Sequence, residues 1–484
     1  MSLLTRYQLL ANDLAEAIAH GSLGAGSRLP SIRAAAMQHQ VSLNTVTAAY
    51  RLLEDRGLVE ARPQSGYYVK SALPTPQTPL RDAPGTPATA SRTIRDLVAV
   101  VLEAQQRDDH IDLALAIPHG QMFYPGEKLG RLTASLLRRT PDMLSHYALP
   151  PGSLLLREQI ARRGLQLGMK LAPDDILLTH GAMEALQLAL RAVTTAGDTV
   201  GVESPSYFNL YPLLASLGLN VLEIPTHPQH GLSLDALELL LQEQRLAAVI
   251  AMPTVHNPLG CTMPLDAKKR LAKLVNHYRV PLIEDALYAE LQFTDAPSPA
   301  VRSFDTDGWV MVCASYTKTL APDYRIGWLE AGRFGETVRQ LKFASSIAES
   351  TLLSEAVGQF LANGGYDHHL RTLRRRYAQQ VDTVRGLIAR HFPAGTRATQ
   401  PTGGFLLWLE LPQGVDTLAL FHAALAERIV IMPGSLYSSS ARYAHCLRIS
   451  CCHEMNARFS NALIRLGELA KIQAGKAQEL LPTA

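Results

Sequence analysis

The chain contains 484 residues, of which 47% are hydrophobic and 18% are charged. A chain of this length can bury large cores, so we expect two or more domains rather than one small domain. The formal net charge of +3 at pH 7 is too small for the chain as a whole to attract nucleic acid, so any basic surface must be local.

The sequence shows no pattern typical of export, of a membrane span or of a metal site. Its five cysteines lack the paired spacing of metal ligands, and a reducing compartment suits them best. The N-terminus has no charged-then-apolar signal pattern, and no apolar run approaches the roughly 20 residues that a membrane span needs. We therefore expect a cytoplasmic protein with no membrane partner and no bound metal.

Residues 1–70 predict a small α+β unit. Apolar residues recur at spacings of three and four between residues 3 and 19, which predicts a first helix with one apolar face. Ser31 can cap a second helix, and Ser42 can cap a third that ends near Gly57. Two short alternating runs then flank the sequence PQSG, which predicts a hairpin, or wing. The pattern as a whole predicts a winged helix-turn-helix.

The charges on this unit favour nucleic acid as its partner. No acidic residue lies between Glu16 and Glu54, whereas Arg28, Arg33 and Arg51 are present, so the surface of the two short helices does not repel phosphate. Short polar side chains at the start of the third helix can reach phosphates or base edges. The alternative is a helix-turn-helix with a structural role, in which these side chains only cap the helix.

Residues 71–91, SALPTPQTPLRDAPGTPATAS, contain five prolines and almost no large apolar side chain. Such a segment cannot form a core, so we expect an extended, semi-rigid linker. A surface loop within one domain is the alternative, although structureless loops of this length are uncommon in compact domains. The expected organisation is a DNA-binding unit at 1–70, a linker at 71–91 and a larger domain at 92–484.

From about residue 110 onward, short runs rich in Val, Ile and Leu alternate with helical patterns. This alternation predicts an α/β domain with a mostly parallel sheet that is buried on both faces. Ligands of such sheets bind at the carboxyl ends of the strands. Three polar residues, Asn257, Asp285 and Lys318, follow predicted strands at this edge.

The surroundings of Lys318 suit an aldehyde cofactor that carries a phosphate. Its ε-amine can form an imine, while the hydroxyls of Ser315 and Thr317 and the guanidinium of Arg325 can bind the phosphate. Pyridoxal 5′-phosphate is that molecule. Taken singly, each residue has an ordinary explanation, such as a solvated loop lysine or an arginine paired with a carboxylate. Their joint order at strand ends is what chance does not readily produce.

Further residues complete the expected cofactor site. Asp285 would keep the pyridine nitrogen protonated, and Asn257 and Tyr288 would donate to the ring 3-oxygen. Tyr207 can stack on the ring. Backbone amides where a strand turns into a helix would bind the phosphate, and they belong to Gly181, Ala182 and Met183.

The stretch GSRLPSIRAAAMQHQVSLNTVTAAYRLLEDRGLVEARPQSGYYV resembles the winged-helix domain of the GntR superfamily of bacterial regulators, in helix order, in the LPSxR turn and in the Gly-ended wing. The resemblance implies binding to a double-stranded DNA operator. The contacts that it implies are Arg33, Ser42, Asn44, Thr45, Thr47, Arg62, Ser65 and Gly66. Leu43 stands where relatives often have a basic residue, so the resemblance does not imply an operator sequence.

Residues 110–470 resemble the fold-type I aminotransferases, through the motifs HNPLG, EDALY, SYTK and RIGW. The resemblance implies that Lys318 is the Schiff-base lysine and that Arg448 binds the α-carboxylate of a substrate or effector. It also implies a homodimer in which Tyr147 reaches the cofactor phosphate of the neighbouring subunit. The chain departs from the family at Ala182 and Met183, where relatives often have Ser-Gln, and we expect cofactor binding to survive this change.

Winged helix, linker and aminotransferase-like domain together resemble the MocR subfamily of bacterial transcription factors. The resemblance implies a regulator in which aldimine formation at Lys318, with the cofactor alone or with an amino-acid effector, modulates operator binding. The alternative is a catalytically active aminotransferase that carries a DNA-binding domain, because the residues that transamination requires are all present. Whether the protein is an enzyme therefore stays open.

The sequence HHLRTLRRRY at residues 368–377 is strongly basic. Its ordinary interpretation is a solvated helix face. The alternative is a second track for DNA.

Overall fold

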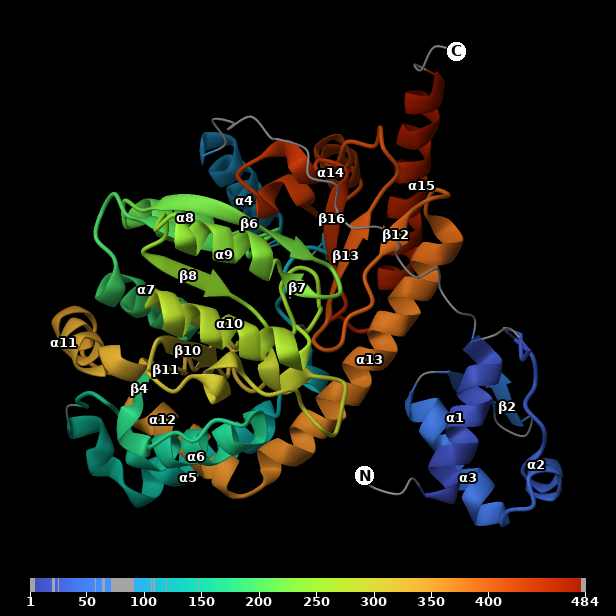
Figure 1. The fold of residues 1–484 in the computed structure, drawn as a ribbon, viewed down its shortest axis with the longest axis horizontal. Helices are drawn as coiled ribbons and strands as arrows, with labels where there is room; N and C mark the ends of the chain where they lie inside the picture. Colours follow the sequence, from blue (N-terminus) through green and yellow to red (C-terminus); the bar gives the residue numbers. More distant parts are fainter. Residues whose placement is uncertain are drawn as a thin grey trace. The chain divides into compact units, whose positions relative to one another are not determined.

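The computed structural model describes residues 5–19, 22–24, 26–56, 58–62, 66–70, 91–105, 107, 109–118, 120–146 and 148–479. It divides the chain into two compact units, Met1–Thr75 and Pro76–Ala484 (Figure 1). Ser65, Tyr147 and the expected linker, apart from Ser91, lie outside the described residues. No helix among the described residues is long and apolar enough to cross a membrane.

The first unit has the predicted helix-turn-helix and wing. Its helices are α1 (Arg6–Ala19), α2 (Ile32–Gln38) and α3 (Leu43–Asp55), and its strands β1 (Val59–Arg62) and β2 (Gly66–Val69) pair antiparallel. As predicted, Ser31 Oγ caps α2 by accepting a hydrogen bond from Ala34 N, and Ser42 Oγ caps α3 by accepting one from Thr45 N.

The small core of this unit lies under one face of α3. Val46, Ala49, Tyr50 and Leu53 recur at helical spacing and are buried against α1 and the wing. The Tyr50 hydroxyl donates to Pro30 O (2.9 Å), which satisfies the polar end of an otherwise apolar side chain. The opposite face of α3 is therefore left for solvent or for a partner.

The second unit contains an eight-stranded sheet in the order β4-β11-β10-β9-β8-β5-β6-β7. The four neighbouring pairs β10–β9, β9–β8, β8–β5 and β5–β6 are parallel. Strand β11 runs antiparallel to both of its neighbours, β10 and β4, and β7 runs antiparallel to β6. This confirms the predicted mostly parallel sheet. The strand bounds are β4 (Ile176–Thr179), β5 (Thr199–Ser204), β6 (Asn220–His227), β7 (Gly231–Leu232), β8 (Ala248–Ala251), β9 (Leu282–Asp285), β10 (Val310–Ser315) and β11 (Gly327–Glu330).

Both faces of this sheet are covered by helices, so its strands are apolar on both sides. On β8, Ala248 and Ile250 pack toward α7, while Val249 and Ala251 pack toward α9 and α10 (Figure 1). The helices of this part are α5 (Gly126–Arg139), α6 (Leu154–Gly164), α7 (Ala182–Val193), α8 (Leu210–Ser216), α9 (Leu234–Gln242), α10 (Leu265–Tyr278), α11 (Gly335–Ser345) and α12 (Thr351–Ala362).

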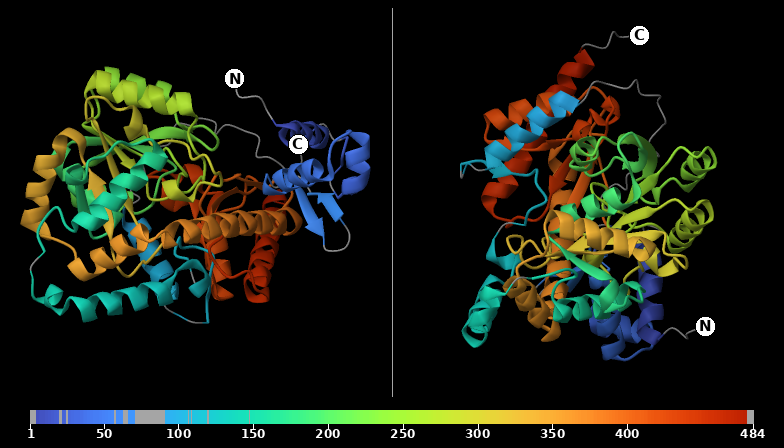
Figure 2. Two further views of the ribbon diagram at one scale, coloured as in Figure 1. Left: turned by 90° about the horizontal axis from the view of Figure 1, so that it is seen from below. Right: turned by 90° about the vertical axis from the view of Figure 1, so that its left-hand side faces the viewer.

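A smaller α+β subdomain follows, as the resemblance to the fold-type I aminotransferases implies. It contains the antiparallel sheet β12-β13-β16-β15 and the short parallel pair β3–β14. The 27-residue α13 packs on both α12 and α15 and so joins the two parts of the unit (Figure 2). The bounds are α4 (Ser91–Gln105), β3 (Ile111–Asp112), α13 (Gly365–His391), β12 (Arg397–Ala398), β13 (Leu406–Glu410), α14 (Thr417–Ala426), β14 (Ile429–Val430), β15 (Met432–Pro433), β16 (Cys446–Ser450) and α15 (Ala457–Glu479).

Gly327 is where β11 comes closest to the β4–α7 turn. A Cβ at this position would lie 2.6 Å from the carbonyl carbon of Gly181 and 2.9 Å from Ala314 O, and both are backbone atoms that cannot rotate away. The glycine therefore sets how tightly the turn that precedes α7 packs on the sheet.

We expect Gly327→Ala to destabilise the second unit by about 1–3 kcal/mol, because the added methyl group overpacks the strand against a backbone turn. Thermal unfolding followed by tryptophan fluorescence measures this, since Trp309, Trp328 and Trp408 are the chain's three tryptophans and all lie in this unit. The matched control is Gly335→Ala, at a helical position with open space around a new Cβ, which should leave the unfolding temperature unchanged or raise it. Equal unfolding temperatures for the two variants would contradict the packing argument.

Candidate functional site

Lys318 lies three residues after Ser315, the last residue of β10, and its Nζ donates a hydrogen bond to Ala116 O (2.6 Å). Burial lowers the pKa of its amine to about 8, and the nearby charges of Arg448 and Arg325 act in the same direction. A lysine with this pKa has an appreciable neutral fraction near pH 7. Lys318 is therefore a far better nucleophile than a surface lysine.

Asp285 is the last residue of β9, beside Cys313 of β10 in the parallel register. Its Oδ1 accepts a hydrogen bond from Leu287 N (3.0 Å). Burial raises the pKa of this carboxyl to about 7. A positively charged ring nitrogen would supply the counter-charge that a buried carboxylate needs.

The β4–α7 turn forms a cradle with Arg325. Gly181 precedes α7 with φ +80°, and Arg325 Nη2 donates to His180 O (3.2 Å). A Cβ on Gly181 would lie 2.7 Å from that same Nη2, so only glycine leaves room for the guanidinium. Ser315 lies opposite Gly327 on the neighbouring strand, and its Oγ is 3.1 Å from Thr317 Oγ1. Backbone amides, two hydroxyls and a guanidinium thus meet at one strand end, which is a donor set for phosphate.

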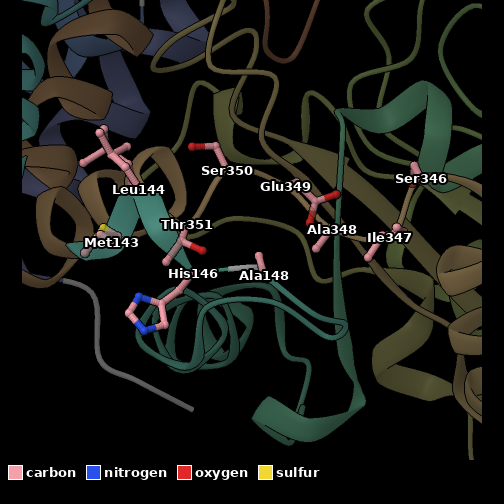
Figure 3. A pocket seen from close by; sticks show the side chains of 11 residues that line it. Met143, Leu144, His146, Ala148, Ser346, Ile347, Ala348, Glu349, Ser350 and Thr351 are labelled. Atoms are coloured by element: carbon pink, nitrogen blue, oxygen red, sulfur yellow. The ribbon is translucent and has the colours of Figure 1, made fainter. Parts of the chain in front are cut away.

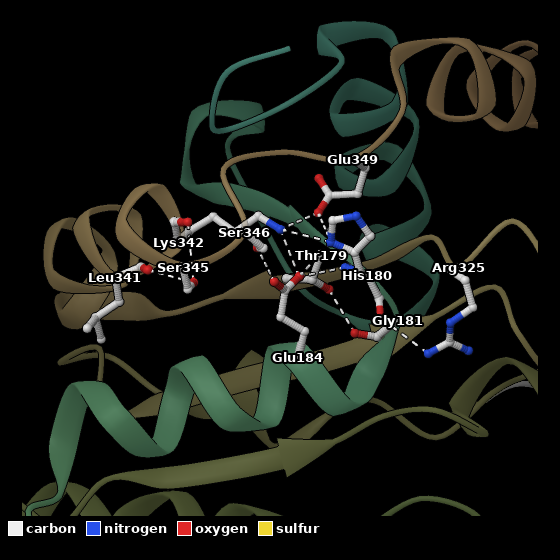
Figure 4. A network of polar contacts seen from close by, with 10 residues as sticks. All are labelled: Thr179, His180, Gly181, Glu184, Arg325, Leu341, Lys342, Ser345, Ser346 and Glu349. Atoms are coloured by element: carbon white, nitrogen blue, oxygen red, sulfur yellow. Dashed lines mark hydrogen bonds and ion pairs between the residues drawn. The ribbon is translucent and has the colours of Figure 1, made fainter. Parts of the chain in front are cut away.

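Ala182 and Met183 are the first two residues of α7, as the expected cradle requires. The helix start is held from behind by Glu184, which accepts a hydrogen bond from His180 N (2.6 Å) and one from Lys342 Nζ (2.7 Å) (Figure 4). Lys342 is fully buried and also bonds Glu349.

His180, Glu184 and Glu349 could together ligate a metal ion. The Lys342 ammonium already lies between the two carboxylates, so this cluster has its positive charge. We interpret it as a structural anchor of α7. Sequence reasoning missed it, although a glutamate at the third position of a helix was the available signal.

Arg448, in β16, is completely buried. Its Nη1 donates to Asn257 Oδ1 (3.1 Å), its Nη2 donates to Ala114 O (2.5 Å), and its Nε has no hydrogen-bond partner among the described residues. None of the carboxylates in the described part of the chain forms an ion pair with it. A buried guanidinium with only neutral acceptors suits an incoming carboxylate, whose two oxygens would compensate the cost of burying the charge.

The remaining predicted cofactor residues surround the same space. Tyr288 is buried with its ring edge-to-face on Phe405, and burial raises its pKa well above the usual value. Burial also raises the pKa of Tyr207, on which the charges of Arg448 and Asp285 act as well. The structure thus brings Asn257, Asp285, Tyr288, Lys318 and Arg448 together. For Tyr207 it gives proximity to these charges and no ring partner other than Phe208 within the described residues.

Residues 113–118, which we call the covering segment, also contribute to the site, and no pattern in the sequence predicts this contribution. Its place is fixed by two backbone hydrogen bonds, Leu113 N to Val430 O and Ser450 N to Leu113 O (both 2.9 Å). From this position, two carbonyls of the covering segment accept the hydrogen bonds of Arg448 and Lys318 described above. The two cations of the site are therefore both held by the same short stretch of backbone.

A cavity of about 290 Å³ lies between residues 143–148 and residues 346–352 (Figure 3). Glu349, which belongs to the anchor of α7, also lines this cavity.

In the first unit, the predicted DNA contacts lie on α2, α3 and the wing. Arg33 and Asn44 are exposed, Ser42 Oγ is 2.8 Å from Thr45 Oγ1, and Thr47 Oγ1 donates to Leu43 O (2.9 Å). In the wing, Arg62 pairs with Glu60 (2.7 Å) and stacks on the Tyr68 ring, and Gly66 has φ +109°.

The basic stretch 368–377 belongs to α13, and part of its charge is used inside the unit. Arg374 Nε donates to Glu290 O (2.8 Å), and Arg376 bonds Met122 O. His369 bonds Thr319 O (2.8 Å). Of the four arginines only Arg371 and Arg375 are exposed, so a second DNA track would rest on these two side chains.

Comparison with known proteins agrees with the description of both units, the helix-turn-helix and the cofactor-binding domain. The family of aminotransferase class I and II matches residues 124–465, and the gntR family of bacterial regulatory proteins matches residues 6–69. Two uncharacterized HTH-type transcriptional regulators of Escherichia coli K12 match almost end to end. YjiR is 36% identical, covering 96% of this chain and 98% of its own, and YdcR is 37% identical, covering 96% and 99%. The solved multiple substrate aminotransferase from Thermococcus profundus is 26% identical and covers 80% of this chain and 96% of its own, with a TM-score of 0.73.

These matches define a helix-turn-helix regulator that is fused to an aminotransferase-like domain of fold type I. The chain belongs to the aminotransferase class I and II family, and its GntR-type N-terminal domain places it in the MocR arrangement. DNA is the partner of the first unit, and pyridoxal 5′-phosphate is the cofactor of the second. The residues present fit this cofactor, because the site offers a low-pKa lysine, a buried carboxyl and a glycine turn that the Arg325 guanidinium approaches closely.

We expect the rate at which the protein captures the cofactor to rise with pH up to about 8 and then to level off, because only the neutral Lys318 amine attacks and burial lowers its pKa to about 8. Stopped-flow absorbance in the visible range after mixing with pyridoxal 5′-phosphate measures this rate. Lys318→Ala should give no bound-cofactor band, whereas Lys269→Ala, at an exposed lysine of α10, should behave as wild type. A rate that keeps climbing toward pH 10 would show an ordinary lysine pKa.

Proposed function

We propose that the protein is a transcriptional regulator of MocR type in which the state of Lys318, with cofactor alone or with cofactor and an amino-acid effector, modulates operator binding. Its functional parts are a DNA-binding domain at 1–70, a linker at 71–91 and a cofactor-binding domain at 92–484, and it acts in the cytoplasm, where its DNA is. The site residues have the roles that the sequence predicts for them.

The covering segment is the observation that carries the regulatory role. Chain order runs from the linker into α4, then β3, then the covering segment. Only α4 and β3 thus stand in the chain between the linker and the segment whose carbonyls bond Lys318 and Arg448. A ligand that changes the hydrogen bonds of these two cations changes how firmly this stretch is held.

When bound, the cofactor would supply an aldehyde group for a lysine amine and a ring that withdraws electrons. Lys318 would hold the cofactor through its amine and would then have fewer N–H groups to donate to Ala116 O. Arg448 receives the effector carboxylate, which neutralises the guanidinium and weakens its bond to Ala114 O. Asp285 holds the ring nitrogen in its protonated form. Only a difference in ligand affinity between two arrangements of the chain can alter DNA binding, and the covering segment offers such a difference.

A homodimer is part of the proposal. Leu144, Leu149 and Leu154 are 67%, 59% and 53% exposed, and they flank position 147 in sequence. Three exposed leucines in one short stretch of chain, of which Leu144 also lines the cavity, support contact with a second copy, which would let Tyr147 reach the neighbouring cofactor phosphate.

The second candidate is an active aminotransferase with a DNA-binding domain. The observation that favours it is the intact pair of Lys318 and Asp285 beside the carboxylate-binding Arg448. A steady-state assay with amino donors and 2-oxo acids separates the two candidates. Turnover in the usual range of about 1–1000 per second would support the enzyme, and no turnover would support the regulator, whereas slow half-transamination is compatible with either.

We expect the affinity for an operator duplex, at fixed salt, to differ between the cofactor-free, cofactor-loaded and amino-acid-loaded forms. The duplex is one that the full-length protein selects from a random-sequence pool, and fluorescence anisotropy gives the dissociation constant. Lys318→Ala should bind with one affinity whatever is added, because the amine is missing, whereas Lys269→Ala should respond as wild type. Equal affinities for all three forms of the wild-type protein would contradict the regulatory role.

The substitution Arg448→Lys distinguishes the response of operator binding to the cofactor from its response to the amino acid. It should keep the response to the cofactor and lose the response to the amino acid, because a lysine cannot bind a carboxylate in the bidentate manner of a guanidinium.

A further inference from the structure

The outward face of α3 has an unusual composition for a DNA-reading helix. Opposite the buried residues of this helix, the side chains at spacings of four are Leu43, Thr47 and Arg51, with Asn44 beside them. Leu43 is the first residue of the helix and is 50% exposed. A large apolar side chain thus stands at the helix start, where helix-turn-helix proteins contact base edges.

The hydroxyl groups around Leu43 are occupied by local structure. Ser42 Oγ accepts from Thr45 N (3.1 Å) and lies 2.8 Å from Thr45 Oγ1, and Thr47 Oγ1 donates to Leu43 O (2.9 Å). These bonds hold the first turn of the helix, so the hydroxyls have less capacity for base edges. Leu43 and Asn44 are therefore the side chains of this turn that remain available to contact DNA.

The charges of the unit guide this face toward DNA. The arginines at 28, 33 and 51 are exposed, and the chain from residue 17 to residue 53 contains no acidic residue. Arginines can bind the phosphates on either side of a groove, while the centre of the helix face meets the bases.

The major groove offers one apolar group to such a face, the 5-methyl group of thymine. We infer that Leu43 contacts a thymine methyl group, so that each half-site of the operator contains an A·T pair at the position that this side chain reads. The contact removes both apolar surfaces from water, and it discriminates thymine from cytosine without a hydrogen bond.

The test removes the methyl group and nothing else. The full-length, cofactor-loaded protein selects a duplex from a random-sequence pool, and each thymine of that duplex is then replaced singly by deoxyuridine. We expect one replacement per half-site to weaken binding about fourfold at fixed salt, which is the effect of one buried methyl-sized group. The other replacements should change affinity by less than twofold.

Variants of the protein assign the effect to Leu43. In Leu43→Ala the sensitive replacement should no longer weaken binding, whereas Leu43→Met, which keeps an apolar side chain of similar size, should retain the sensitivity. Met37→Ala is the matched control, because Met37, in α2, is the other large apolar side chain of α2 and α3 that is strongly exposed, at 83%. This variant should also respond as wild type. If no deoxyuridine weakens binding, or if the loss is as large in Leu43→Ala as in wild type, the inference is wrong.

Discussion

Burial of positive charge is the constraint on which the second unit depends. Arg448 is completely buried and Lys318 is half-buried, and no carboxylate of the described residues pairs with either of them. An unpaired buried cation costs several kcal/mol, and backbone carbonyls compensate only part of that cost. A bound ligand would compensate this unfavourable free energy, with an aldehyde and a phosphate near Lys318 and a carboxylate at Arg448. Burial lowers the pKa of the Lys318 amine, and the charges of Arg448 and Arg325 lower it further.

The buried cation of Lys342, in contrast, is paired with carboxylates. Lys342 is as deeply buried as Arg448, yet it has two carboxylates of its own chain and a fixed place behind α7. This paired lysine stiffens the helix start that carries the phosphate cradle. Arg448 and Lys342 are thus equally buried but differ in whether a carboxylate of the described residues supplies a counter-charge.

Part of this arrangement could be predicted from the sequence. Asp285 and Lys318 were found because buried β-runs end directly before a polar residue, and the capping serines of the first unit were found because helix starts need side-chain acceptors. The covering segment could not be found, since its contribution comes from carbonyls that every residue has. Arg374 and Arg376 looked like surface charge because their partners, Glu290 O and Met122 O, are distant in sequence. Local sequence patterns predict where strands end and where helices are capped. The tertiary partners of long side chains can be identified only from the three-dimensional structure.

The use of main-chain carbonyls at the covering segment has a consequence for how its sequence can vary. No substitution removes a carbonyl, so residues 113–118 can exchange side chains of similar size without losing either contact. What the segment needs instead is its backbone path, which depends on Asp112 Oδ1 accepting from Ala114 N and Leu115 N (2.7 and 3.0 Å). A proline at either of those two positions would delete a donor and redirect the chain. Selection on this region should therefore act on Asp112 and against proline, and leave the identity of the small apolar side chains comparatively free.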